Sequence, residues 1–124
     1  MIDFKSSAVF KLTPTKNDEG FKLVEPMLVD NESVFASFKT IRDMVVFTNK
    51  RAIAINVQGI TGKKKDFTSL PYSKIQAFSV ETAGTLDLDC EIELWFSALG
   101  KVKFEIVGSF DIRSFNRLLS NYIL

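Results

Sequence analysis

Four carboxylates in the second half of the chain stand close enough in sequence to suggest metal binding. Asp87, Asp89, Glu91 and Glu93 occupy alternate positions, so they share one face if this segment is a strand. Side chains in such a row diverge, whereas a divalent cation needs oxygens that surround it, and the glycine and closing glutamate of an EF-hand loop are missing. We therefore interpret the row as the solvated face of a strand, and we expect no metal and no cofactor.

Groups suited to catalysis are scarce. The sequence has no histidine, the side chain that titrates nearest neutral pH, and its one cysteine is Cys90. Cys90 falls at an inward position of an apolar alternation, which predicts an inert core residue rather than a nucleophile. A single cysteine cannot form an intramolecular disulfide, and this favours a reducing compartment or indifference to the redox state of the compartment. We expect no catalytic residues and a protein that is not an enzyme.

Two glycines followed by lysines invite comparison with a phosphate-binding loop. The Walker motif needs four residues between its glycines and then a helix, whereas two residues separate Gly59 from Gly62 and a strand pattern follows. A hairpin turn accounts better for these glycines. Lys50, Lys63 and Lys64 form a possible basic patch that would bind an anionic lipid headgroup. The alternative is a solvated edge strand that its lysines protect from aggregation.

Composition limits the classes of partner and location. The chain has 124 residues, with 16 Lys and Arg against 15 Asp and Glu. Proteins that bind nucleic acid usually carry a stronger positive field, so we expect no nucleic-acid partner. No stretch approaches the ~20 apolar residues of a membrane span, and the first residues lack the apolar core of a signal peptide. We expect one domain in the cytoplasm.

Short alternating segments separated by turn residues would position these groups. They predict seven strands over residues 33–41, 44–48, 51–57, 63–70, 75–82, 89–96 and 101–106. The last two alternate most regularly, and the acidic outer face of one would lie opposite the mainly basic outer face of the other. Strand parity points Phe35, Ile41 and Trp95 outward.

The end of the chain changes to helical periodicity. Apolar residues predict an amphipathic helix over residues 111–123, with Ile112, Phe115, Leu119 and Tyr122 on one side. Seven short strands followed by one helix indicate a mainly β fold, in which the helix closes the open end of a barrel.

Residues 1–32 carry weaker signals. Pro14 and the polar residues up to Gly20 predict a turn or mobile loop, and the apolar residues that follow keep helical spacing for one or two turns. We expect this irregular, partly helical segment to pack on a barrel formed by residues 33–124, so that the whole chain makes one domain.

Several strings resemble the bacterial pleckstrin-homology (PH)-like family in residues, order and spacing. They are 41–43 (IRD), 47–51 (FTNKR), 58–64 (QGITGKK), 71–72 (PY), 80–84 (VETAG) and 87–89 (DLD). The resemblance covers roughly residues 22–124. It implies a PH-like barrel of two near-orthogonal antiparallel sheets, with four and three strands, capped by one C-terminal α-helix.

The resemblance also implies a function. Members of this family tend to assemble into cyclic homo-oligomers, such as a pentamer, and a role in protein–protein interaction is implied. Polar residues at strand ends inside the strings are then the candidate interface: Arg42, Asp43, Arg51, Glu81 and Thr82. The alternative for these residues is local capping of turns. The expected partners are a second copy of the chain and an unidentified protein, and the alternative function is a peripheral membrane module that binds anionic lipid.

Overall fold

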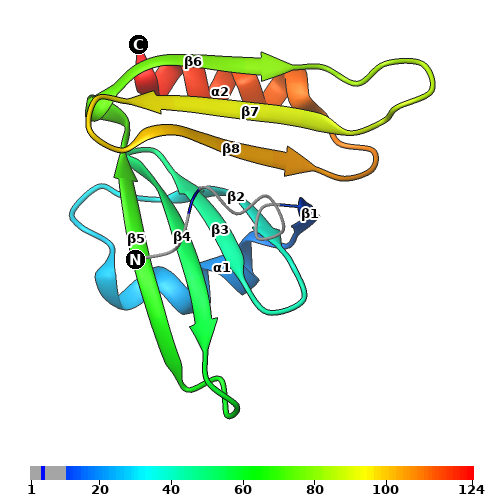
Figure 1. The fold of residues 1–124 in the computed structure, drawn as a ribbon. Helices are drawn as coiled ribbons and strands as arrows, with labels where there is room; N and C mark the ends of the chain where they lie inside the picture. The colour runs from blue at the N-terminus through cyan, green and yellow to red at the C-terminus, as the bar shows by residue number, and fades with distance from the viewer. Residues whose placement is uncertain (1–3, 5–10) are drawn as a thin grey trace.

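Eight strands and two α-helices make up the part of the chain that the computed structural model describes, which is Phe4 and residues 11–124 (Figure 1). In chain order the elements are β1 (Lys11–Thr15), α1 (Asn17–Val24), the 3-10 turn η2 (Glu25–Met27), β2 (Val34–Lys39), β3 (Met44–Thr48), β4 (Arg51–Gln58), β5 (Lys64–Pro71), the 3-10 turn η3 (Tyr72–Lys74), β6 (Ile75–Glu81), β7 (Cys90–Phe96), β8 (Gly100–Ile106) and α2 (Ile112–Ile123).

The strands form two antiparallel layers that cross at a steep angle (Figure 1). One layer contains β2 to β5 and the other contains β6 to β8, and β1 joins them in the strand order β5-β4-β3-β2-β1-β8-β7-β6. The second half of β1 pairs antiparallel with β2, and its first half pairs parallel with β8. The predicted mainly β barrel with a C-terminal helix is confirmed, with one strand more than the seven predicted.

The additional strand and α1 replace the turn or mobile loop predicted around Pro14. This proline lies opposite Phe38 of β2, in the half of β1 that pairs with β2. A proline is tolerated there because that stretch has a neighbour on one side only. The short helix expected from helical spacing is α1, but Gly20 lies inside it rather than before it. Residues 1–3 and 5–10 of the N-terminal segment lie outside the described residues.

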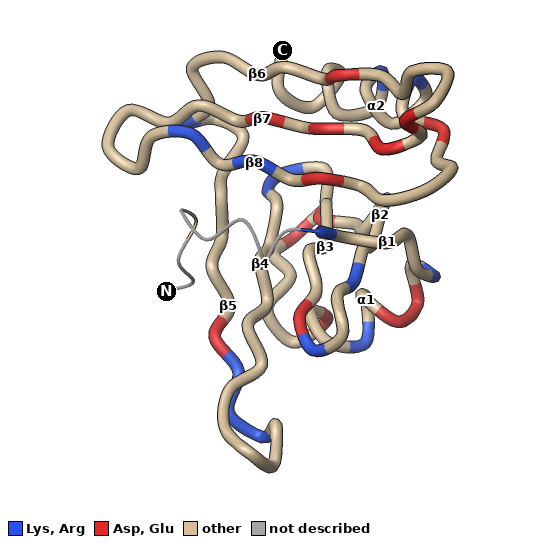
Figure 2. Tube along the Cα trace, turned by 45° about the vertical axis from the view of Figure 1, so that its right-hand side comes forward, with Lys and Arg blue, Asp and Glu red and all other residues tan. Residues whose placement is uncertain are grey.

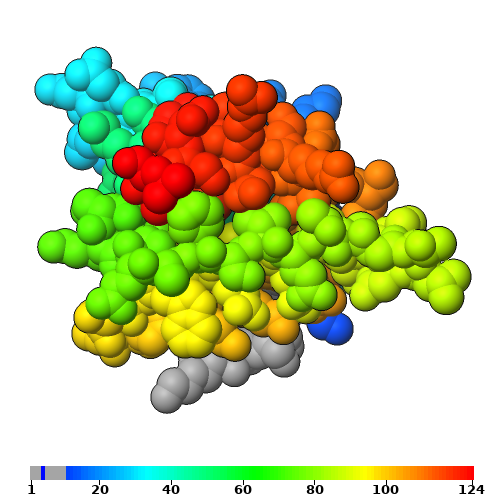
Figure 3. Space-filling model, turned by 90° about the horizontal axis from the view of Figure 1, so that it is seen from above, coloured from blue at the N-terminus to red at the C-terminus, as the bar shows by residue number. Residues whose placement is uncertain are grey.

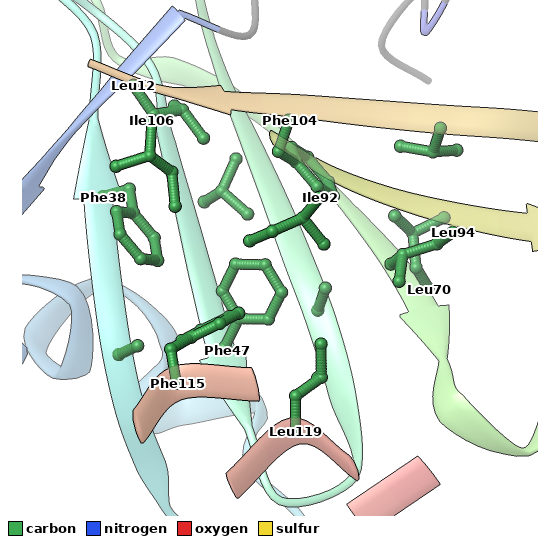
Figure 4. Close-up of a cluster of buried hydrophobic side chains, with 14 of the residues drawn as sticks. Leu12, Phe38, Phe47, Leu70, Ile92, Leu94, Phe104, Ile106, Phe115 and Leu119 are labelled. Atoms are coloured by element: carbon green, nitrogen blue, oxygen red, sulfur yellow. The ribbon is translucent and has the colours of Figure 1, made fainter. Parts of the chain in front are cut away.

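The larger hydrophobic core fills the space between the two layers and α2 (Figure 4). Phe47 of β3 lies at its centre. The centroid of its ring is 5.0 Å from the ring centroid of Phe115 on α2 and 5.8 Å from that of Phe104 on β8. Ile112 and Leu119 are buried beside Phe115, as the helical periodicity predicts. Cys90 is buried in the same core, as its inward position predicts, and burial raises the pKa of its thiol.

A second, smaller core lies on the other face of the β2–β5 layer, under α1. Val24 of α1 packs with buried residues of β3 and β4, which are Met44, Val46, Ile53 and Ile55. Gly20 permits this close approach, because a Cβ atom there would lie 2.2 Å from Ser37 Oγ of β2. Consequently β3 is buried along its whole length.

The outward position predicted for Phe35 is wrong. A register shift between Val34 and Ala36 interrupts the alternation of β2. Phe35 therefore turns towards the larger core, where its ring lies 5.7 Å from Phe115 and 5.2 Å from Tyr122. Trp95 is 43% exposed, as parity predicts, and Ile41 is fully exposed, although it lies beyond the end of β2 in the β2–β3 turn, where parity does not apply.

The β7–β8 hairpin forms as the alternation predicts. Glu93 lies opposite Lys103, and the ion pairs run diagonally, with 3.8 Å between Glu93 and Lys101 and 3.2 Å between Glu91 and Lys103. The Lys101 ammonium also lies 5.5 Å from the centre of the Trp95 ring. These contacts occupy the outer face of the hairpin.

Candidate functional site

The β3–β4 turn contains one end of the candidate site, and Thr48 organises it. The Thr48 hydroxyl accepts hydrogen bonds from the backbone N–H groups of Lys50 and Arg51, both at 3.0 Å. It donates to a Glu32 carboxylate oxygen at 2.7 Å. Threonine suits this position because its side chain satisfies turn donors that no strand neighbour can reach. The turn is therefore held rigidly against residues 28–33.

Arg51 and Glu32 form a nearly buried ion pair beside this turn. The Arg51 guanidinium donates to the two carboxylate oxygens of Glu32 at 2.9 and 3.0 Å, in the bidentate geometry of strong charge-assisted pairs. It also donates to the Met27 carbonyl at 2.8 Å and to the Ser69 hydroxyl at 2.9 Å. All these hydrogen bonds of the guanidinium are made within the protein. Through them Arg51, which begins β4, connects η2 and β5.

Burial opposes ionisation of the Glu32 carboxyl. Hydrogen bonds from Arg51, Thr48 and the Val29 backbone outweigh that effect, and they lower the pKa of Glu32 below its ordinary value. Glu32 is therefore ionised near neutral pH, and its charge is neutralised by Arg51.

Tyr72 of η3 joins Thr48, Arg51 and Glu32, and we call these four residues the polar cluster. Its hydroxyl donates to the Thr48 carbonyl at 2.7 Å. Burial, with smaller contributions from Tyr122 and Glu32, raises the pKa of Tyr72, so the phenol stays neutral. Asn49 holds the neighbouring loop by accepting from the Ser33 N–H at 2.8 Å. The arrangement provides fixed donors and acceptors but no pair of groups poised for proton transfer to a substrate.

Arg42 and Asp43 lie at the opposite end of the β2–β5 layer, in the β2–β3 turn. Asp43 accepts from the Val57 N–H at 2.9 Å, and the Arg42 guanidinium donates to the Gly59 carbonyl. The structure therefore brings the string at 41–43 together with the string at 58–64. Both side chains hold the neighbouring β4–β5 turn, in line with the capping alternative.

The other candidate residues lie apart from one another. Lys50 is in the β3–β4 turn, whereas Lys63 and Lys64 follow the β4–β5 turn at the far end of β4. The eight residues of β4 span about 26 Å, so these three lysines do not form one patch. Glu81 ends β6 and Thr82 follows it in the other layer, and both are exposed.

Two open hollows lie next to these residues. The first, which we call the tip hollow, has a volume of about 680 Å³ and is lined by Lys11, Thr13, Lys39, Thr40, Ile41 and Arg42. The second, which we call the helix-end hollow, has a volume of about 550 Å³ and lies between residues 29–32, the β3–β4 turn, residues 71–73 and the end of α2. Within the described residues, no group of three or more His, Cys, Asp or Glu side chains could hold a metal ion.

Sequence reasoning missed Glu32 and Tyr72 as members of the polar cluster. Tyr72 stands inside the string at 71–72, but nothing in the sequence distinguishes a tyrosine that bonds a backbone carbonyl from one that only fills space. Glu32 precedes β2 and meets Arg51 across the sheet. Its charge is an ordinary surface charge in the sequence, so the pairing depends on tertiary structure.

Comparison with known proteins identifies the family. The family model described as bacterial PH domain matches residues 3–123. The chain belongs to the bacterial PH domain family. The predicted family is confirmed, and the strings at the β2–β3 and β3–β4 turns lie within the matched residues.

Two similar proteins come from Bacillus subtilis. The uncharacterized protein YjqA of Bacillus subtilis is 55% identical over 71 residues, which are 57% of this chain and 57% of YjqA. The uncharacterized protein YvbH of the same organism is 38% identical over 79 residues, which are 62% of this chain and 37% of YvbH. The aligned part thus spans little more than half of YjqA and a smaller share of YvbH.

Solved structures show the same fold. A protein with a pleckstrin-homology domain from Shewanella loihica has a TM-score of 0.77 and 39% identity, covering 93% of this chain and 99% of that one. A pleckstrin homology domain from Shewanella amazonensis has a TM-score of 0.64 and 38% identity, covering 89% and 90%. Among the described residues of this bacterial PH domain, no helix is long and apolar enough to cross a membrane.

Proposed function

We propose that this bacterial PH domain is a non-catalytic cytoplasmic module that assembles into a closed cyclic homo-oligomer and presents polar strand ends to a protein partner. The observation that carries the proposal is the open strand order, in which β5 and β6 each have a strand neighbour on one side only within the described chain. An unpaired edge is a template for another strand. Head-to-tail contact between β6 of one copy and β5 of the next would use both edges and close into a ring.

Charge at the two edges supports this association. β5 begins at Lys64 and Lys65, which are exposed, whereas β6 ends at exposed Glu81. Like charges disfavour contact between two identical edges, β5 against β5 or β6 against β6, and this leaves the mixed contact favoured. Arg42 and Asp43 are already fixed by intramolecular hydrogen bonds, so a polar surface built on them would lose little side-chain entropy on binding, and Arg51 would support such a surface from within rather than contact the partner.

Size-exclusion chromatography with light scattering, followed by native mass spectrometry, tests assembly directly. We expect one species with a fixed number of protomers at high micromolar concentration. A strict monomer at that concentration would overturn the proposal. A crosslinked pull-down from the source organism would then identify the protein that binds the assembled form.

The tip hollow favours a second candidate function, the binding of an anionic lipid headgroup. Lys11, Lys39 and Arg42 line it, and three cations around one hollow attract a phosphate group. Two of them already have partners, since Lys39 lies 3.7 Å from Glu19 and Arg42 donates to Gly59. Flotation with vesicles of phosphatidylcholine, with and without phosphatidylserine, tests this function. Equal recovery with both vesicles at low salt would exclude it.

A further inference from the structure

The β6–β7 loop (residues 82–89) exposes leucines between acidic residues. Leu86 is 100% exposed and Leu88 is 56% exposed, and Asp87 and Asp89 stand beside them. Large apolar side chains in an exposed loop gain free energy when a partner buries them. This combination of leucine and aspartate marks the loop as a contact element.

The β6–β7 loop is held in shape by its own hydrogen bonds. The Gly84 N–H donates to the Asp87 carbonyl at 2.7 Å, and an Asp87 carboxylate oxygen accepts from the Asp89 N–H at 3.0 Å. An Asp89 carboxylate oxygen accepts from the Gly108 N–H at 3.0 Å and ties the loop to the end of β8. A loop that is already ordered binds with a smaller entropy cost.

A row of carboxylates strengthens the negative field at the base of this loop. Glu81 of β6 lies opposite Glu91 of β7, which lies opposite Glu105 of β8. Neighbouring carboxylates repel one another; Lys103 pairs with Glu91 at 3.2 Å and offsets part of this repulsion, and a cation brought by a partner would offset more of it. Figure 2 shows acidic segments gathered along this end of the β6–β8 layer.

The helix-end hollow has the complementary chemistry. Its lining includes the apolar residues Val29, Pro71 and Ile123, and also Lys50, Ser73 and Tyr122, whose side chains carry hydrogen-bond donors. No side chain of the described residues pairs with the Lys50 ammonium, the Ser73 hydroxyl or the Tyr122 hydroxyl.

Glu32, the one carboxylate among the described residues that line this hollow, does not compete for these donors. Glu32 is bonded to Arg51, Thr48 and the Val29 N–H, and its side chain has no exposed surface. The free groups in the hollow are therefore donors and a cation, and they fit an aliphatic side chain followed by a carboxylate.

The β6–β7 loop and the helix-end hollow lie at opposite ends of β6. This strand begins directly after η3, whose residues line the hollow, and it ends at Glu81, where the loop begins. Seven strand residues span about 23 Å, so the loop does not reach the hollow of its own chain. Figure 3 shows the yellow-green loop at one end of this face and the red C-terminal end of α2 at the other.

We propose that the β6–β7 loop of one copy docks in the helix-end hollow of the next copy, with Leu86 against the apolar walls and Asp87 paired with Lys50. The inference rests on the proposed self-assembly and names its contact, which sets the end of β6 in one copy beside the end of β5 in the next. Because each copy offers one loop and one hollow at opposite ends, the contact is head-to-tail and can close into a ring. The partner is a second copy because the loop and the hollow are complementary in both charge and apolar character.

A charge exchange tests this contact in the intact chain. We expect Lys50→Glu and Asp87→Lys each to raise the protein concentration at which the assembly dissociates by tenfold or more, measured by light scattering. The double variant restores the attraction with its sign reversed, so we expect it to assemble at the wild-type concentration. Lys22→Glu on α1 is the matched control for a change in surface charge, and we expect it to assemble as the wild type does.

The outcomes separate the contact from self-assembly itself. A wild-type protein that stays monomeric overturns the proposed self-assembly and, with it, this contact. A wild-type protein that assembles while both single variants assemble equally well overturns the docking but leaves self-assembly standing. Loss of assembly in both single variants without recovery in the double variant also overturns the Lys50–Asp87 pairing. Circular dichroism of each variant establishes that the fold is intact.

Discussion

The two layers of the sheet differ in how many of their faces are covered. In the β2–β5 layer, the barrel core packs on one face and α1 packs on the other, and β3 is buried at each of its five positions. In the β6–β8 layer, β7 alternates between buried inner residues and more exposed outer ones. Its outer face is occupied by charged pairs rather than by a helix.

This difference assigns separate roles to the layers. A layer covered on both faces derives its stability from apolar burial and depends on the N-terminal segment that provides α1. A layer with one exposed face keeps its charged side chains available to a partner. The following changes test this assignment, in order of decreasing effect.

The largest effect is expected for Phe47→Ala. Phe47 has no exposed surface, and its ring contacts Phe35, Phe38, Phe104 and Phe115. Its truncation should lower the free energy of unfolding by about 3–5 kcal/mol, because a cavity replaces these contacts. Urea denaturation measures the loss. Trp95→Ala on the exposed face of β7 is the control, and a loss as large as that of Phe47→Ala would contradict the difference between the layers.

Glu32→Gln should have the second largest effect. It removes the charge from the bidentate pair with Arg51 and should cost about 1.5–3 kcal/mol, the range for hydrogen bonds to charged groups. The control is Glu25→Gln, an exposed carboxylate on η2. An unchanged denaturation midpoint for Glu32→Gln would show that the polar cluster does not stabilise the fold.

The stabilising effect of Glu32 should depend on pH. The pKa of Glu32 is lowered in the folded protein, so its carboxylate contributes stability above the unfolded value, and this contribution is lost as the pH falls through the lowered value. The difference in unfolding free energy between wild type and Glu32→Gln should therefore shrink as the pH falls below 4.5, the ordinary value for glutamate. Denaturation curves at several pH values measure it, and a difference that grows on acidification would contradict the assignment.

Gly20→Ala tests how closely α1 packs on the β2–β5 layer. Alanine favours a helix, but its Cβ atom would lie 2.2 Å from Ser37 Oγ and 3.0 Å from a methyl carbon of Val46. We expect a net loss of about 1–2 kcal/mol from overpacking. Ser37 Oγ is buried without a hydrogen-bond partner in the described chain, so Ser37→Ala should cost little and should recover part of the loss in the double variant. Strictly additive losses would show that the two positions do not compete for space.

The smallest effect is expected for Lys103→Gln on the outer face of the β6–β8 layer. The variant removes the ion pair with Glu91, whose two side chains are both partly exposed. Exposed pairs contribute little because water and salt screen them, so the denaturation midpoint should stay within experimental error at moderate salt. A clear drop in the midpoint would show that this layer also depends on its charged face.

The β6–β8 layer and α2 were predictable because local patterns determine them. The alternation from Cys90 to Phe96 and the spacing of Phe115 and Leu119 follow directly from one buried face. The first layer was harder to predict. A strand buried on both faces has no alternation, and the bulge before Ala36 shifts the parity on which the outward position of Phe35 was predicted.

The candidate site was predictable only in part. The strings at 41–43 and 47–51 pointed to the β2–β3 and β3–β4 turns. In the structure, hydrogen bonds hold Arg42, Asp43 and Arg51 in fixed positions there. The sequence could not show that Arg51 meets Glu32, or that the hollow beside them combines Lys50 with the end of α2. Both depend on contacts between segments that are far apart along the chain.

The parallel pairing of β1 with β8 has a consequence for the order of folding. Lys11 lies opposite Glu105, so the first strand of the described chain completes its pairing with one of the last. Contacts between such distant segments slow folding, because a long loop must close before they form. During synthesis on the ribosome, β2 to β5 can pair and receive α1 while β8 is still absent. The joint between the layers then forms late, and the new chain carries an unfinished barrel until β8 and α2 have emerged.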